Sequence, residues 1–128
     1  MKDYLKENVY DALTAREEIT SQVGTRIKFY EYPSPRGLSG PVIIIDPLDV
    51  PLPSEFADNR FLYWDVLFQV DVWSYERLAT ASLMQNVTLA LWEEGLLPAG
   101  GVVDEWDRET GVFRQATRFR GKIRRTDL

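Results

Sequence analysis

The stretch LYWDVLFQVDVW, residues 62–73, contains the clearest strand of the sequence. Its residues alternate between two kinds, and this period of two is expected for a β-strand with one face on a core. The first set is wholly apolar: Leu62, Trp64, Val66, Phe68, Val70 and Val72. The second set is mixed: Tyr63, Asp65, Leu67, Gln69, Asp71 and Trp73. We predict that the first set faces the core and that the second faces solvent or a partner.

A helix and a hairpin are predicted after this strand. Apolar residues recur at helical spacing over residues 75–94, with Ser74 as the expected N-cap and Gly95 as the stop. A strand over residues 102–108, a turn at 109–111 and a final strand over 112–124 follow. Every residue of one face of the last strand is basic except Ala116: Arg114, Arg118, Arg120, Lys122 and Arg124.

Two helices and a strand are predicted in the N-terminal part of the chain, before the long strand at 62–73. Residues 2–15 carry an apolar stripe of Leu5, Val9, Ala12 and Leu13. The Thr14 to Glu17 spacing is that of a capping box, which would start a second short helix that Gly24 ends. Residues 26–32 then alternate as a strand does.

Six of the seven prolines lie between residues 33 and 60. Proline lacks an amide donor and cannot continue a ladder or a helix interior. We therefore predict two long loops here, separated by one short buried strand at 41–46. Loops of this length are usually functional or mobile.

The order of elements favours an α+β fold, because consecutive strands joined by short turns pair antiparallel. We expect a mostly antiparallel sheet of four to five strands with two main helices packed on one face. The length of 128 residues is that of a single domain, residues 1–128.

Composition excludes several kinds of chemistry. The sequence has no cysteine and no histidine, so a thiolate nucleophile, a Ser-His-Asp triad and a zinc hydrolase are excluded. No phosphate-binding loop pattern is present. No apolar run approaches the about 20 residues of a membrane span, and the first residues do not resemble a signal peptide, so we expect a soluble intracellular protein. No catalytic, cofactor-binding or metal-binding residue is predicted.

Charge is distributed unevenly. Residues 1–111 contain nine basic and nineteen acidic residues, whereas residues 112–128 contain six basic residues and one acidic residue. The basic face of the last strand has three interpretations. In the first, the strand binds the phosphates of a nucleic acid. In the second, it docks on an acidic protein surface. In the third, it is a solvated face that pairs across strands with Glu105, Asp107, Asp65 or Asp71. The net charge of −5 disfavours general nucleic-acid binding.

The acidic cluster before the last strand and two tryptophans each allow two interpretations. Glu105, Asp107 and Glu109 would share one face of a strand, where they would either bind a hard cation or lie in solvent beside arginines. Trp73 and Trp106 fall on the less apolar faces, so they lie either at an interface or under the long loops. A histidine-free hydrolase that uses carboxylates stays possible, but no pair of acids is singled out.

Two short segments carry a family resemblance. Val23-Gly24-Thr25-Arg26-Ile27 ends the leading helical part, and Gln69-Val70-Asp71-Val72-Trp73 ends the long strand before a helix. With the proline-rich stretch between them, this layout over residues 1–95 resembles the tail completion or tail terminator proteins of long-tailed bacteriophages (siphoviruses) and prophages.

The resemblance implies a structural role without catalysis. It implies a small α+β subunit that forms a ring, typically of six copies, which caps the tail tube and joins it to the head. Expected partners are copies of the chain, the tail tube protein and the head-neck connector proteins, in the virion and, during assembly, in the host cytoplasm. The expected interface residues are Arg114, Arg118, Arg120, Lys122, Arg124, Trp73, Asp65 and Asp71. The alternative is a small nucleic-acid-binding module that uses the same basic strand.

Overall fold

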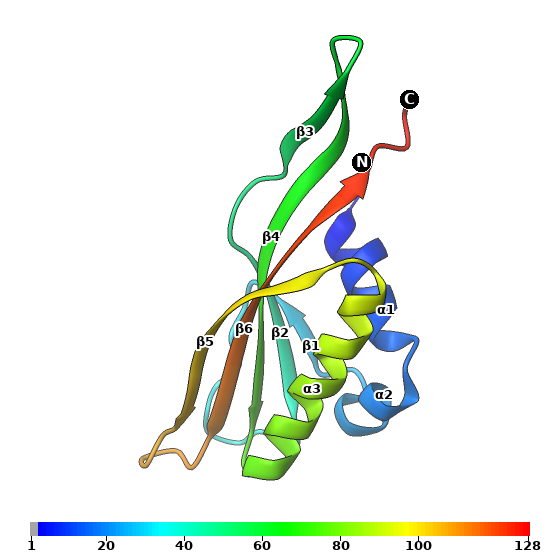
Figure 1. The fold of residues 1–128 in the computed structure, drawn as a ribbon. Coiled ribbons are helices and arrows are strands. Elements are labelled where there is room, and N and C mark those ends of the chain that lie inside the picture. Colours follow the sequence, from blue (N-terminus) through cyan, green and yellow to red (C-terminus); the bar gives the residue numbers. More distant parts are fainter. Residues whose placement is uncertain (1–2) are drawn as a thin grey trace.

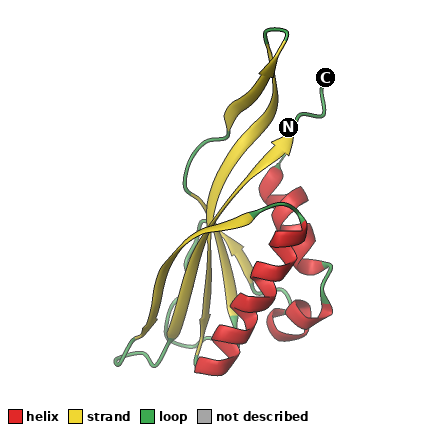
Figure 2. Cartoon of the chain, in the orientation of Figure 1, coloured by secondary structure: helices red, strands yellow, loops and turns green. Residues whose placement is uncertain are grey.

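The structure, a computed structural model, describes residues 3–128 and confirms the α+β class (Figures 1 and 2). The helical segments are the π-helical turn η1 (Leu5–Tyr10), α1 (Asp11–Thr14), α2 (Glu17–Val23) and α3 (Arg77–Glu93). The strands are β1 (Ile27–Phe29), β2 (Val42–Pro47), β3 (Leu52–Ala57), β4 (Arg60–Ser74), β5 (Leu97–Trp106) and β6 (Phe113–Arg124). The part of the first predicted helix at position 2 lies outside the described residues.

The sheet has six strands in the order β1-β2-β4-β6-β5, and β3 pairs with the outer end of β4. Only β1 and β2 pair in parallel among the described strands, so the mostly antiparallel arrangement is confirmed. One strand more than expected is present because β3 forms inside the proline-rich region. Pro53 is tolerated there since β3 lies at the edge of the sheet, where a missing amide donor breaks no ladder.

All helices cover one face of the sheet (Figure 2). The predicted core face of the long strand is confirmed for its inner part, because Val66, Phe68, Val70 and Val72 are all buried against the helices. Phe68 stacks on Phe119 of β6, with ring centroids 5.6 Å apart. Leu62 and Trp64 are only half-buried, since this end of β4 extends beyond the helical layer.

The β3–β4 hairpin forms an arm that projects from the body (Figure 1). Asp58 and Asn59 at its tip both have positive φ, as a type I′ turn requires. Phe56 on the arm is 71% exposed. The segment predicted as a loop is therefore a defined protrusion without helical cover.

A second, smaller apolar layer lies on the other face of the sheet. Ile44 pairs with Asp71 and points away from the helices, yet it is fully buried. The proline-rich segment accounts for this burial: Tyr32 packs on Trp73, and the Tyr75 hydroxyl accepts hydrogen bonds from the Gly37 and Leu38 amides. The first predicted long loop is therefore packed on the sheet.

The predicted helix boundaries are partly wrong. Thr14 forms no capping box, because its hydroxyl donates to the Tyr10 carbonyl at 2.9 Å and Arg16 is the N-cap of α2. Ser74 is not the N-cap of α3; its Oγ accepts from the amide of Glu76, which occupies that position. Gly95 stops α3 as expected, with φ of 75°.

Strand boundaries also differ from those predicted. β5 starts at Leu97 rather than at residue 102, and it runs through Gly100 and Gly101 with two register shifts. Such irregularity is common at the edge of a sheet, where bulges also hinder pairing with other chains. β1 is shorter than expected, spanning only three residues.

We predict that Phe68→Ala lowers the free energy of unfolding by about 3–5 kcal/mol, because it leaves a cavity between β4, β6 and the helices. Denaturant unfolding measures the change. The matched control is Phe56→Ala on the arm, which removes the same atoms from an exposed site and should change stability by less than about 0.5 kcal/mol. Equal losses in the two variants would contradict the assignment of the core.

Candidate functional site

The basic face of β6 consists of Arg114, Arg118, Arg120, Lys122 and Arg124, on the side of the sheet away from the helices. The register with β4 places Arg118 opposite Gln69, Arg120 opposite Leu67, and Lys122 opposite Asp65. Asp71 and Trp73 belong to the same face of β4. The structure thus brings all eight predicted interface residues onto one side of the sheet, although it does not make them equivalent.

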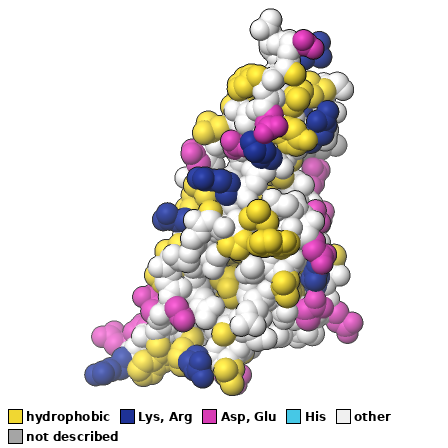
Figure 3. Space-filling view, viewed as in Figure 1, with side chains coloured by type: hydrophobic (Ala, Val, Ile, Leu, Met, Phe, Trp, Pro, Cys, Tyr) yellow, Lys and Arg dark blue, Asp and Glu magenta, His cyan; other side chains and the backbone are white. Residues whose placement is uncertain are grey.

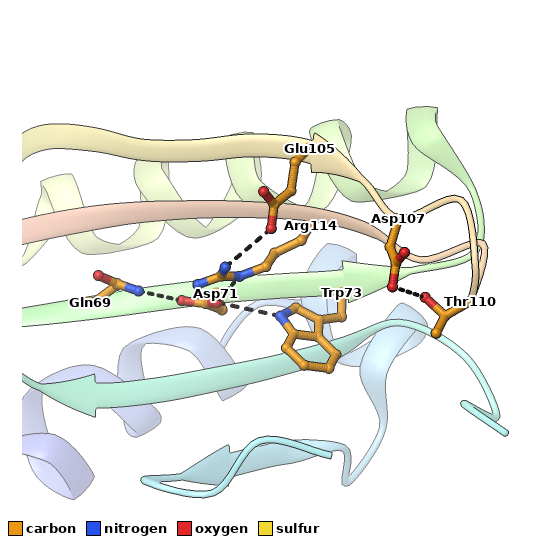
Figure 4. Close-up of polar contacts among 7 residues, drawn as sticks. All are labelled: Gln69, Asp71, Trp73, Glu105, Asp107, Thr110 and Arg114. Carbon is orange, nitrogen blue, oxygen red and sulfur yellow. Dashed lines mark hydrogen bonds and ion pairs between the residues drawn. The ribbon is translucent and has the colours of Figure 1, made fainter. Parts of the chain in front are cut away.

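Asp71 is the centre of a hydrogen-bonded cluster, the Asp71 cluster, formed with Gln69, Trp73, Arg114 and Glu105 (Figure 4). Its fully buried carboxylate accepts from Arg114 Nε at 2.6 Å, Gln69 Nε2 at 2.8 Å and Trp73 Nε1 at 3.3 Å. Arg114 Nη1 also lies 3.3 Å from Glu105 Oε1 on β5. The cluster therefore links β4, β6 and β5 on the outer face.

The contacts of Arg114 with Asp71 and Glu105 favour the charged form of its guanidinium. Burial by itself lowers the pKa of the guanidinium, but hydrogen bonds and attraction to Asp71 and Glu105 raise it overall. A buried carboxylate needs such a partner, because an isolated ion away from water is very costly. Arg114 and Asp71 are thus engaged with each other inside the subunit.

Trp73 lies under the proline-rich segment, which is the second of the two interpretations of this residue. Its ring packs on Tyr32 at 5.6 Å between centroids, and its indole donates to Asp71. Trp106, by contrast, is largely exposed beside Phe113. The sequence did not predict Gln69 and Tyr32 as partners of this cluster. The alternation along the strand placed Gln69 on the same face as Asp71 and Trp73, but no local pattern indicated Tyr32.

Lys122 and Arg124 also have partners within the chain, but only Lys122 forms ion pairs. Lys122 Nζ lies 3.2 Å from Glu55 and 3.3 Å from Asp65, and both acids are about half exposed. The hydrogen bond with Glu55 is the largest cause of a raised Lys122 pKa. The Arg124 guanidinium lies over the Tyr63 ring, 5.5 Å from its centroid.

Arg118 and Arg120 differ from their neighbours. Both are exposed, and neither forms an ion pair with any other residue of the described range 3–128. The cross-strand pairing alternative therefore holds for Arg114 and Lys122 only. Neutralised cations on both sides interrupt the row of charges that phosphate tracking would need, which leaves one pair of arginines available to a partner.

The carboxylates near the β5–β6 turn do not form a cation site. Glu105 is bound to Arg114, while Asp107 lies beyond the end of β5 and accepts from Thr110 Oγ1 at 2.8 Å. Within residues 3–128, no group of three or more candidate ligands that could hold a metal occurs. The expectation that Glu105, Asp107 and Glu109 share a strand face is wrong, since the turn begins at Asp107.

The open pocket beside the Asp71 cluster is small. It has a volume of about 260 Å³ and is lined in part by Pro35, Trp73, Asp107 and Arg114. The polar groups around it already bind one another (Figure 4). No helix within residues 3–128 combines the length and the hydropathy required to cross a membrane.

The fold of this chain is similar to that of a chain in a solved structure. No protein-family model matches this chain, and no curated protein matches its sequence. Among solved structures, a chain of the structure titled "Virion of native gene transfer agent (GTA) particle" matches with a TM-score of 0.61 and 17% sequence identity. The match covers 94% of this chain and 95% of that one. At this identity the likeness establishes the shared fold.

We predict that Arg114→Met lowers the free energy of unfolding by about 3 kcal/mol, because it leaves the buried Asp71 carboxylate without its cation. The matched control is Lys122→Met on the same strand, which also removes a cation with two acidic partners. Those partners are exposed, so the loss should be much smaller. Chemical denaturation of both variants measures the contrast, and comparable losses would show that burial of Asp71 does not matter.

Proposed function

We propose that this chain is a structural subunit of a phage or phage-like virion. More specifically, we propose a tail terminator or tail completion subunit that forms a ring, of six copies, at the head-proximal end of the tail tube. The observation that carries the proposal is the end-to-end likeness of fold with a chain of the gene transfer agent virion. The segments at residues 23–27 and 69–73, which resemble those of tail terminator proteins, support it independently.

The site geometry favours binding to proteins over catalysis. The buried carboxylate of Asp71 is held by three donors, and Glu105 and Asp107 are bound to Arg114 and Thr110. The groups left for a partner are charged and exposed, as in Arg118 and Arg120. Charged surfaces of this kind steer association and set its specificity.

The partners we propose are other copies of the chain, the tail tube protein and the head-neck connector proteins. The arm is suited to reach a neighbouring protein, because it projects from the body and carries the exposed Phe56 (Figure 1). The proposed location is the virion and, during assembly, the host cytoplasm.

Deletion of the gene from the phage or prophage that encodes it should yield separated heads and tails, seen by electron microscopy, because the proposed ring joins the two. Expression of the wild-type chain from a plasmid should restore joined particles. Intact particles in the deletion strain would contradict the proposed function.

Rescue by variants tests the basic face. Arg118→Glu with Arg120→Glu should fail to restore joined particles, because it reverses the two cations of the basic face that have neither an acidic nor an aromatic partner within the described residues. Lys28→Glu with Arg36→Glu, which makes the same change of net charge at exposed sites outside β6, should restore them. Equal rescue by the two double variants would exclude the basic face as an interface.

The nucleic-acid alternative is tested separately. We predict that the isolated chain is not retained on a double-stranded DNA column at moderate salt, because its net charge of −5 opposes binding and two cations of β6, Arg114 and Lys122, are ion-paired. Retention that weakens steeply with salt and is lost in the Arg118→Glu, Arg120→Glu variant would favour the nucleic-acid module instead.

A further inference from the structure

The outward surface of α3 is apolar where a surface helix is normally charged. Leu78, Leu89 and Trp92 are 71%, 60% and 57% exposed. We call these three residues the α3 stripe. No charged residue occurs between Arg77 and Glu93, at the two ends of the helix. The space-filling view shows apolar side chains in the middle of this face, with acidic ones along the edge beside it (Figure 3).

The opposite side of the same helix already packs on the sheet, through buried residues such as Leu83, Val87 and Leu91. Leu78, Leu89 and Trp92 lie about half a turn away, on a side that also exposes the uncharged polar residues Ser82 and Gln85. The α3 stripe is therefore a surface that a partner is expected to cover, since its apolar side chains have no charged neighbour along the helix.

We propose that a second copy of this chain covers the α3 stripe, with the part of its outer sheet face around Arg118 and Arg120. The contact is head-to-tail: the stripe of one subunit meets the sheet of the next. This inference rests on the proposed function, since it names the surfaces through which the proposed ring would assemble.

The receiving surface combines apolar side chains with the two free arginines. Arg120 pairs in register with Leu67 of β4 on one side and Leu97 of β5 on the other, so all three share the outer face. Leu97 is exposed and Leu67 is half-buried. A pocket of about 170 Å³ opens beside them, and its lining includes Leu52, Leu67 and Arg120 as well as two acidic residues, Asp49 and Asp65. A large apolar side chain such as Trp92 of a neighbour is a suitable occupant, because interface anchors are typically aromatic residues in such pockets.

Charge complementarity identifies the occupant as a second copy. The helical segments 3–24 and 75–94 contain eight acidic and three basic residues, whereas β6 contains five basic residues and no acidic one. Glu76 and Glu94 lie just beyond the two ends of α3, and neither forms an ion pair within the described residues. Glu94, which lies near Trp92, is the natural partner for Arg118 or Arg120 of the next subunit, because these arginines also lack an ion pair; Glu76 lies at the far end of the helix.

The positions of the two surfaces favour a head-to-tail contact. The stripe lies on the helical side of the sheet, and Arg118 and Arg120 lie on the other side, so one copy can contact two neighbours at once. Contacts between two different surfaces generate closed rings or open filaments. A symmetric pair of α3 stripes would instead produce a dimer and leave the arginines free.

Native mass spectrometry of single and mixed variants tests the proposal. The stripe variant is Leu89→Gln with Trp92→Gln, which removes apolar surface and keeps a good helix former. The sheet variant is Arg118→Glu with Arg120→Glu. The wild-type chain should form species larger than a dimer as its concentration rises, and each variant alone should stay monomeric. An equimolar mixture should form one-to-one dimers and nothing larger, because each variant retains one intact surface.

Matched controls separate assembly from folding. Tyr30→Gln removes an exposed aromatic ring outside both surfaces and outside the arm, and Lys28→Glu with Arg36→Glu changes the net charge as the sheet variant does. Both controls should assemble as the wild type does. At a concentration at which the wild-type chain is monomeric, every variant should keep the wild-type circular dichroism spectrum and unfolding midpoint, which shows that it is folded.

Three results would overturn the proposal: a wild-type chain that stays monomeric up to its solubility limit, a sheet variant that dimerises alone, or a mixture that forms no dimer. The second result would indicate a symmetric α3 contact. None of them bears on the gene deletion experiment. Separated heads and tails in the deletion strain, together with any of these results, would leave the proposed function standing and reject only this contact.

Discussion

The alternation of β4 is the constraint on which the rest of the structure depends. Its fifteen residues pair with β2, β3 and β6, so every other layer is arranged relative to its two faces. Phe68 and its apolar neighbours at every second position bury one face under the helices. Because side chains alternate strictly along a strand, the same register fixes Asp65, Asp71 and Trp73 on the opposite face. A shift of one residue would bury Asp65 and Gln69 in the helical core.

The burial of Asp71 determines how the outer face is organised. A carboxylate removed from water needs donors, and Gln69, Trp73 and Arg114 provide them from two strands. Arg114 thereby becomes part of the internal structure. Lys122 is occupied by Glu55 and Asp65 at the base of the arm. Two of the five cations of the basic face are thus ion-paired within the chain and Arg124 lies over Tyr63, whereas Arg118 and Arg120 have neither an acidic nor an aromatic partner.

The proposed assembly would account for three exposed features of the molecule together. These features are the uncharged outer side of α3, the two exposed arginines Arg118 and Arg120, and the projecting arm. In an isolated subunit each of them faces solvent without a binding partner. Apolar and charged surfaces of this kind are typical of proteins that bind partners. The proposed ring of a tail terminator is one assembly that would use all three features.

The sequence by itself determined the fold class, the core face of the long strand, the hairpin of β5 and β6, and the side of the sheet on which the basic residues lie. All of these follow from local periodicity or from turn residues, which act within a few positions of one another. Only the tertiary structure decided that β3 forms within the proline-rich region, that Ile44 is covered from the outer side, and which cations are already neutralised. Arg114 and Asp71 are 43 positions apart in the chain. Contacts over such separations depend on strand order and register, which periodicity along a single segment does not contain.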